Sequence, residues 1–349
     1  MAGPPASRPG DDAFQAPWWL PGPHLQTIVP ALFARRAAVR YVRERWDAPD
    51  GDFIDVDRVA VAADRTHAPT LVVFHGLEGS AESRYVRGLM AAASALGWQG
   101  VAPHFRGCGG TPNRAPRFYH SGDSAEVDWV LRRVKAELAA QRSDTAPIVA
   151  AGISLGGNML LKWLGERGPE AAGIVVAAAA ISAPLDLAAG GASLGRGFNR
   201  IYAKMFLRTL KAKSRHKLTQ HAGLFDRARM EASRDLHAFD DVVTAPLHGY
   251  RDADDYWLRA SSKPLLRHIA VPTLILNARN DPFLPGSALP GADEVSPVVT
   301  LQFPERGGHV GFLAAGPDGS EWMPRRVIRF LASHVDASRR GSDRIPRGT

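Results

Sequence analysis

Short apolar runs alternate with helical patterns along most of the chain. Compact runs of Val, Leu, Ile and Ala predict buried strands, whereas apolar residues that recur every three to four positions predict helices packed by one face. The predicted strands cover 39–46, 53–61, 70–74, 100–105, 148–151, 174–181, 273–277 and 298–303. Predicted helices cover 80–96, the segments after Asp123 and Gly156, and a last segment around Val327. This alternation indicates an α/β fold, with a mostly parallel sheet of about eight strands covered on both faces.

Turn and cap residues mark the beginnings of some of these elements. The first two strands are separated by Pro49-Asp50-Gly51, a sequence typical of a tight turn. The run Asp123-Ser124-Ala125-Glu126 has the pattern of a capping box, which predicts a helix start. Apolar residues then recur on one face of that helix: Val127, Val130, Leu131, Val134 and Leu138.

The run 147–168 contains the pattern G-x-S-x-G between a predicted strand and a predicted helix. A strand that turns sharply into a helix at a Ser strains the backbone there, and Gly152 and Gly156 avoid collisions of Cβ atoms. The hydroxyl is then exposed at the positive end of the helix. G-x-S-x-G also arises by chance in Gly-rich chains. The strand before it and the helix after it favour the nucleophile elbow of an α/β hydrolase, with Ser154 as the nucleophile.

A nucleophilic Ser needs a His as base and a carboxylate to hold that His. In α/β hydrolases the order is Ser, acid, His, on loops that follow later strands. Asp281 follows the strand 273–277, and His309 follows the strand 298–303 in a Gly-flanked loop. Asp186, after the strand 174–181, is the alternative acid. We predict the triad Ser154, Asp281 and His309, and a loop or core role for every other His.

Acyl transfer also needs N–H donors for the oxyanion. The backbone N–H of Leu155, directly after the nucleophile, is one candidate. The other is the N–H of Leu77, in the loop His75-Gly76-Leu77 after the strand 70–74. An ordinary tight turn is the alternative interpretation of this loop, but it lies where the fold requires a donor.

Composition narrows the class of protein. With 349 residues, 45% of them hydrophobic, the chain is long enough for one large core and an insertion. The single Cys108 excludes an intramolecular disulfide framework and fits a reducing compartment. We expect a cytoplasmic protein, because neither a secretory signal nor a membrane-length apolar run is visible. No Cys/His cluster has the spacing of metal ligands, so we expect no metal and no organic cofactor.

The positive charge is concentrated in one segment. The net charge is +8, and residues 204–234 hold nine Lys and Arg but only two acidic residues. That segment lacks any nucleic-acid motif, so we expect no nucleic-acid partner. Apolar residues recur from Phe198 to Leu210 beside a basic stripe: Arg200, Lys204, Arg208, Lys211 and Arg215. Either the apolar side packs on the core and the charges are solvated, or this helix docks on an anionic membrane surface.

These patterns divide the chain into four parts. Residues 1–15 form a Pro/Gly-rich leader and 337–349 a polar basic tail, both expected to be disordered. Residues 16–185 and 266–336 form the α/β core. Residues 186–265 form a helical cap inserted between two strands of that core.

Several longer strings resemble the YheT-like family of α/β hydrolases. They are HGLEGS, FRGCGG, NRAPRFYHSGD, GISLGGNMLLKWLGE, TAPLHGY, RNDPF and GGHVGF, with HLQT near the start. The resemblance extends from about His24 to about His334. It implies the triad Ser154, Asp281 and His309, and esterase or lipase-like activity on carboxylic esters. Asn280 stands where the family pattern has an Asp, but the following Asp281 is retained.

We therefore expect a serine hydrolase that cleaves carboxylic esters through an acyl-enzyme, acting on short- to medium-chain or lipid-like esters. Two alternatives remain: an enzyme with the same triad but another acyl acceptor, and a protein without catalysis. An acyltransferase or ester synthase transfers the acyl group to an alcohol instead of water. A ligand-binding protein on a hydrolase fold often loses a member of the triad, and none is missing here.

Overall fold

The computed structural model describes residues 13–60, 67–141, 146–316 and 319–342. Eight strands form one sheet in the order β1-β2-β4-β3-β5-β6-β7-β8. β1 pairs antiparallel with β2 and β2 antiparallel with β4, whereas the other pairs are parallel. The strands are β1 (Tyr41–Asp47), β2 (Phe53–Val59), β3 (Thr70–Phe74), β4 (Gln99–Pro103), β5 (Ile148–Ile153), β6 (Ala177–Ile181), β7 (Thr273–Leu276) and β8 (Val299–Gln302). The predicted α/β fold is confirmed.

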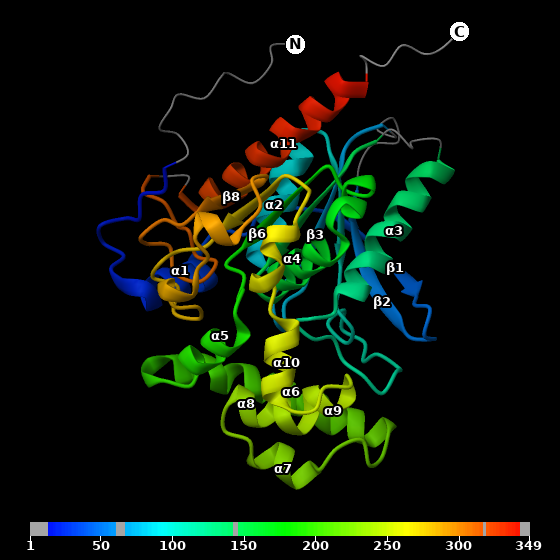
Figure 1. Cartoon of the computed structure of the whole chain (residues 1–349), viewed down its shortest axis with the longest axis vertical. Coiled ribbons are helices and arrows are strands. Elements are labelled where there is room, and N and C mark those ends of the chain that lie inside the picture. Colours follow the sequence, from blue (N-terminus) through cyan, green and yellow to red (C-terminus); the bar gives the residue numbers. More distant parts are fainter. Residues whose placement is uncertain (1–12, 61–66, 142–145, 317–318, 343–349) are drawn as a thin grey trace.

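Helices cover both faces of this sheet (Figure 1). On one face, α3 (Ser124–Ala140) and α4 (Leu155–Arg167) pack on side chains such as Val72 and Ala150. On the other, α2 (Arg84–Ala95) and α11 (Trp322–Ser342) pack on their strand neighbours, such as Leu71. Successive strand residues point to opposite faces, and β3, β5 and β6 are therefore apolar at almost every position.

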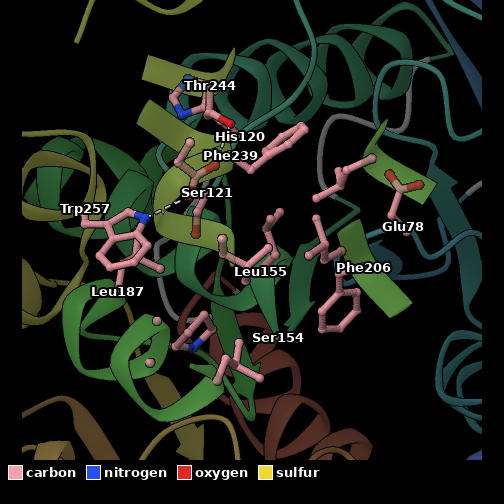
Figure 2. A pocket seen from close by; sticks show the side chains of 18 of the residues that line it. Glu78, His120, Ser121, Ser154, Leu155, Leu187, Phe206, Phe239, Thr244 and Trp257 are labelled. Atoms are coloured by element: carbon pink, nitrogen blue, oxygen red, sulfur yellow. Dashed lines mark hydrogen bonds between the residues drawn. The ribbon is translucent and has the colours of Figure 1, made fainter. Parts of the chain in front are cut away.

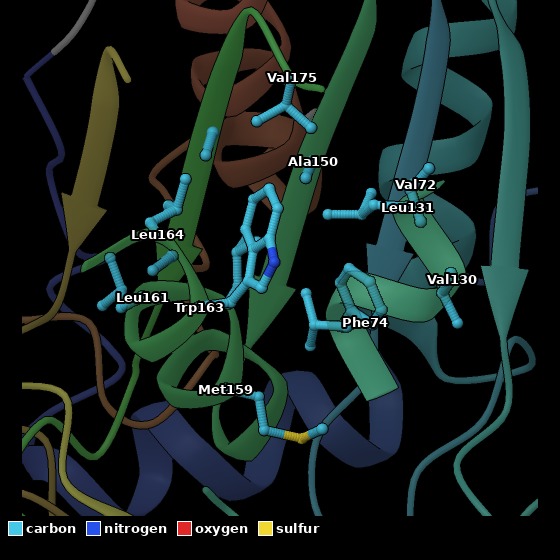
Figure 3. Packing of buried hydrophobic residues seen from close by; sticks show 14 of the residues in the cluster. Val72, Phe74, Val130, Leu131, Ala150, Met159, Leu161, Trp163, Leu164 and Val175 are labelled. Atoms are coloured by element: carbon cyan, nitrogen blue, oxygen red, sulfur yellow. The ribbon is translucent and has the colours of Figure 1, made fainter. Parts of the chain in front are cut away.

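α4 is buried around almost its whole circumference. In Figure 3 its Trp163 lies against the strand that carries Ala150, next to Val175. The indole N–H donates to the Asp128 carboxylate of α3 at 2.9 Å, so the one polar atom of this buried ring is satisfied. Tight packing of α4 matters for the site, because this helix begins directly after Ser154.

Six α-helices, with short 3-10 and π-helical turns, lie between β6 and β7, at the bottom of the molecule in Figure 1. They are α5 (Leu187–Leu194), α6 (Arg200–Gln220), α7 (Arg227–Ala232), α8 (Leu236–Phe239), α9 (Ala245–Leu247) and α10 (Ala253–Ala260). A π-helical turn, Asp240–Thr244, joins α8 to α9. We call residues 187–260 the insertion. It has small apolar clusters of its own, one of them around Met230 and Phe239.

Some predicted details are wrong. α3 begins at Ser124 as expected, but the capping box does not form, because the side chain of Asp123 caps nothing and binds Arg117 instead. Glu126 pairs with Arg106 at 2.6 Å. At the carboxyl end, α11 continues to Ser342, past the predicted start of the tail at 337.

The predicted leader and tail lie mostly outside the described residues. The last residues of the leader are packed, however, because the ring of Phe14 meets that of Phe312 with centroids 5.6 Å apart. α1 (Gly22–Phe33) follows this segment. Within the described ranges, no helix combines the length and the apolar character that crossing a bilayer requires.

Candidate active site

Ser154 lies between the end of β5 and the start of α4 in a strained backbone conformation. Its φ is 52° and its ψ −120°, in a region that side-chain-bearing residues rarely adopt. A Cβ atom at Gly152 would lie 2.4 Å from the carbonyl oxygen of Gly156. One at Gly156 would lie 2.4 Å from the carbonyl oxygen of His75. Only glycine fits at either flank of the turn, as expected for a nucleophile elbow.

Two residues from later loops complete a hydrogen-bonded chain to this hydroxyl. The Nε2 atom of His309 lies 3.0 Å from Oγ of Ser154. On the other side of the ring, Nδ1 lies 2.9 Å from a carboxylate oxygen of Asp281. The Asp281 side chain is almost fully buried and that of His309 nearly so. This arrangement allows the carboxylate to hold the Nδ1–H tautomer, which leaves Nε2 free to accept the Ser proton.

The backbone N–H groups of Leu77 and Leu155, both near Ser154, have no acceptor among the described residues. The N–H groups on either side of Leu77 are occupied, since Gly76 donates to the hydroxyl of Tyr85 at 3.1 Å and Glu78 to that of Tyr119 at 2.8 Å. A Cβ atom at Gly76 would lie 3.2 Å from the Cβ of Ser154, so this loop reaches the nucleophile. The geometry fits an oxyanion hole.

Two hollows meet at Ser154 and His309. The smaller is a cavity of about 150 Å³ beneath the insertion, walled largely by apolar side chains. In Figure 2, side chains of Leu187, Phe206 and Trp257 from the insertion share this cavity with Ser154. The larger is a groove of about 1370 Å³ that runs between α1, α2, α11 and the first half of α6. A substrate held at Ser154 can therefore extend in two directions.

Comparison with known proteins identifies the family of this chain. A family model described as the alpha/beta hydrolase fold matches residues 69–315. The "Putative esterase YheT" of Escherichia coli is 41% identical over 90% of this chain and 91% of its own length. The chain belongs to the YheT-like α/β hydrolases. The family predicted from its motifs is thereby confirmed.

More distant relatives are consistent with this assignment. The human "Phospholipase ABHD3" is 29% identical to the YheT-like chain, over 89% of the chain and 76% of that protein. Among solved structures, an esterase from Exiguobacterium antarcticum superimposes with a TM-score of 0.52 at 16% identity. That likeness covers 83% of this chain and the whole of the esterase, and it shows the shared fold alone.

The YheT-like hydrolase supports its His309 loop with residues to which the sequence analysis assigned no role. Gln26 Oε1 accepts the N–H of Gly307 and the side-chain N–H of Asn280, both at 2.9 Å. Asn280 Oδ1 in turn accepts the N–H of Gly308 at 3.1 Å. Thr27 Oγ1 accepts the N–H of His309 at 2.9 Å. In the sequence, only the family string HLQT pointed to Gln26 and Thr27 as residues of interest.

Asn280 therefore acts as both donor and acceptor in this hydrolase. A carboxylate at position 280 accepts hydrogen bonds but donates none, so it cannot reproduce the bond to Gln26 Oε1. The Asn that stands here in place of the family's Asp thus has a hydrogen-bond partner, Gln26, on α1.

The alternative acid, Asp186, has another task. Its carboxylate accepts the N–H of Ala189 at 2.9 Å and caps the start of α5. His309 contacts Asp281 instead.

Several other histidines are held by hydrogen bonds or ion pairs with groups other than Ser154. Burial lowers the pKa of His75 to about 3, and its Nε2 accepts the N–H of Phe105 at 3.1 Å. His104 pairs with Asp57, and both nitrogens of His248 lie against backbone carbonyls. In the part of the chain that the structure describes, no three His, Cys, Asp or Glu side chains are grouped to hold a metal ion.

Proposed function

We propose that this YheT-like hydrolase cleaves carboxylic esters through an acyl-enzyme formed on Ser154. The observation that carries the proposal is the hydrogen-bonded chain Ser154–His309–Asp281, at the meeting point of two apolar hollows. The 41% identity to a protein named a putative esterase supports the same class of reaction.

In the first half of the reaction, His309 Nε2 takes the proton of the Ser154 hydroxyl as Oγ attacks the ester carbonyl. Asp281 stabilises the imidazolium that forms and keeps Nδ1 protonated. Negative charge develops on the carbonyl oxygen, and the N–H groups of Leu77 and Leu155 donate to it. The imidazolium then protonates the departing alcohol, which leaves Ser154 acylated.

In the second half, water attacks the acyl carbonyl while the neutral His309 accepts a proton from it. The same two N–H groups stabilise the second tetrahedral intermediate. Its collapse releases the carboxylic acid, and His309 returns the proton to Ser154. Every step uses side chains and backbone amides of this chain.

The hollows support hydrophobic esters as substrates. Apolar walls favour apolar groups by about 25 cal/mol for each Å² removed from water. A cavity of about 150 Å³ accepts a group about as large as benzene. We infer that one part of the ester, of short or medium length, enters this cavity, while the rest lies along the larger groove.

Replacement of the nucleophile tests this function. Ser154→Ala should lower kcat for p-nitrophenyl butyrate by at least about a thousandfold and abolish labelling by a fluorophosphonate probe. Ser296→Ala is the matched control, because that hydroxyl donates to Ile269 near the opposite end of the sheet. Turnover by Ser154→Ala at a near wild-type rate, in a variant with unchanged thermal unfolding, would show that Ser154 is not the nucleophile.

A further inference from the structure

Large exposed apolar side chains gather on one part of the surface. Trp18 is 88% exposed, Phe33 77% and Met205 64%. The same region, made of the segments 18–33 and 198–205, also exposes other large apolar residues: Trp19, Leu25, Leu32, Phe198 and Ile201. We call these eight residues the apolar rim. Exposed apolar residues that gather in this way, unlike single ones, mark an interaction surface.

The two halves of the apolar rim touch each other. Nδ1 of His24 on α1 lies 3.2 Å from the hydroxyl of Tyr202 on α6, and its ring centroid lies 4.4 Å from that of Phe198. Ile28 of α1 packs into the same cluster as Tyr202. α1 and the first half of α6 therefore form one continuous surface, on the side of the molecule where α1 meets the start of the insertion (Figure 1).

Three of the eight rim residues line the groove that leads to the nucleophile. Leu32 from α1 and Ile201 and Met205 from α6 line this groove, which ends at Ser154 and His309. A hydrophobic ester that enters this groove beside the rim can therefore reach Ser154 along largely apolar walls.

Free cations accompany these apolar groups. Lys204 and Arg208 are exposed on α6, as are Arg35 and Arg36 just after α1, and none of the four forms an ion pair within the described chain. The predicted basic stripe is shorter than expected. Lys211 donates to the carbonyls of Glu231 and Ser233, and Arg215 binds the Glu231 carboxylate. Only the first half of α6 presents free charge beside exposed apolar residues.

We propose that the apolar rim docks on a lipid bilayer containing anionic lipids and delivers hydrophobic esters from it to Ser154. The delivery step rests on the proposed function, whereas docking does not. Trp and Phe side chains insert at the level of the headgroups, and Lys204, Arg208, Arg35 and Arg36 face lipid phosphates. A second copy of the chain fits this surface poorly, because a two-fold interface brings the same cations together.

Vesicle flotation tests the apolar part of the proposal. Wild-type protein and Ser154→Ala should both float with phosphatidylcholine vesicles that contain phosphatidylglycerol. Trp18→Ser/Phe33→Ser should lower the partition coefficient at least about tenfold, because both side chains lose their apolar contact with lipid. Val42→Ser/Leu258→Ser is the matched control, since these side chains are 56% and 72% exposed elsewhere on the surface.

The charged part is tested in the same assay. At low ionic strength Lys204→Gln/Arg208→Gln should lower the partition coefficient by about thirtyfold, and added salt should reduce this difference. Arg227→Gln/Arg234→Gln removes the same charge from exposed positions in and after α7, and it should have a much smaller effect. Apart from Ser154→Ala, the variants in these two experiments should hydrolyse water-soluble p-nitrophenyl butyrate at the wild-type rate.

The outcomes separate docking from catalysis. Absence of wild-type flotation at low salt, or equal losses in the rim variants and their controls, overturns docking even if ester hydrolysis is normal. Flotation that depends on the rim supports docking even if Ser154→Ala disproves the mechanism. Self-association at low protein concentration that is lost in Trp18→Ser/Phe33→Ser, without flotation, assigns the rim to a second copy instead.

Discussion

The position of Asp281 shows how single residues decide the proposed chemistry. One carboxylate oxygen accepts the backbone N–H of Phe283 at 2.8 Å, and the carboxylate also binds His309. The Phe283 ring stacks on the His309 ring, with centroids 4.0 Å apart. Three contacts thus orient the proposed acid and base before a substrate arrives, and such preorganisation lowers the cost of reaching a transition state.

Asp281→Asn should lower kcat by about a thousandfold to ten-thousandfold, because an amide favours the wrong His309 tautomer and cannot stabilise the imidazolium. Asp186→Asn is the matched control and should be close to neutral, since Asn caps a helix about as well as Asp. Steady-state kinetics with p-nitrophenyl butyrate compares them. Equal losses in both variants would contradict the assignment of the acid to Asp281.

At the scale of elements, α6 reaches across the small cavity to the loop that carries Leu77 and Glu78. Lys213 Nζ donates to the Glu78 carboxylate at 2.8 Å, and the Tyr119 hydroxyl donates to the same oxygen at 2.8 Å. Glu78 has a φ of 56°, so its backbone is strained and needs such contacts. Because Leu77 directly precedes Glu78, a helix of the insertion helps to position the proposed oxyanion donor.

Lys213→Gln should therefore lower kcat about tenfold with a smaller change in KM, because the Leu77 N–H is displaced from the oxyanion but the apolar cavity is kept. Lys213→Arg should restore most of the loss, since it keeps the ion pair. Lys211→Gln is the control on the same helix, as Lys211 binds carbonyls at and after α7. A loss that appears only in KM, or equally in the control, would limit Lys213 to a structural role.

At the scale of the whole molecule, buried ionisable groups make stability depend on pH. Burial raises the pKa of Asp240 to about 6, while the Trp257 N–H, donating to it at 2.9 Å, opposes the rise. The native state thus binds a proton that the unfolded state has released, and stability falls as the pH rises from about 4 to about 6. His75 acts in the opposite direction. Its lowered pKa makes the protein less stable as the pH falls from about 6.5 towards 3.

Asp240→Asn should accordingly become more stable relative to wild type as the pH rises. The gain between about pH 4.5 and about pH 7 should be on the order of 1 to 2 kcal/mol, since a pKa difference of one unit corresponds to about 1.4 kcal/mol. Urea unfolding at several pH values measures it. Asp241→Asn, which removes a carboxylate paired with Arg229 at the surface, is the control and should show no such gain. A pH-independent difference for Asp240→Asn would contradict this account.

Patterns among residues close together in the sequence were enough to predict the fold class and three candidate site residues. Strand and helix periodicity, and the order Ser, acid, His, led to the α/β fold and to the residues that the structure brings together: Ser154, Asp281 and His309. The physical reason is that the elbow is a local feature, held by Gly152 and Gly156, and that parallel strands present their carboxyl ends at one edge of the sheet.

Other features depended on contacts between distant segments, which only the tertiary structure decided. Gln26 supports a loop near Asn280, 254 positions away, and nothing local at either residue indicates the partner. Asp123 and Glu126 left their expected capping roles because Arg117 and Arg106 lie close enough to bind them. Likewise, α7 and the residue after it bind two of the five residues of the basic stripe, Lys211 and Arg215. Contact with α1 places the start of α6 beside the groove. A side chain binds the strongest partner within reach, and the fold determines which partners those are.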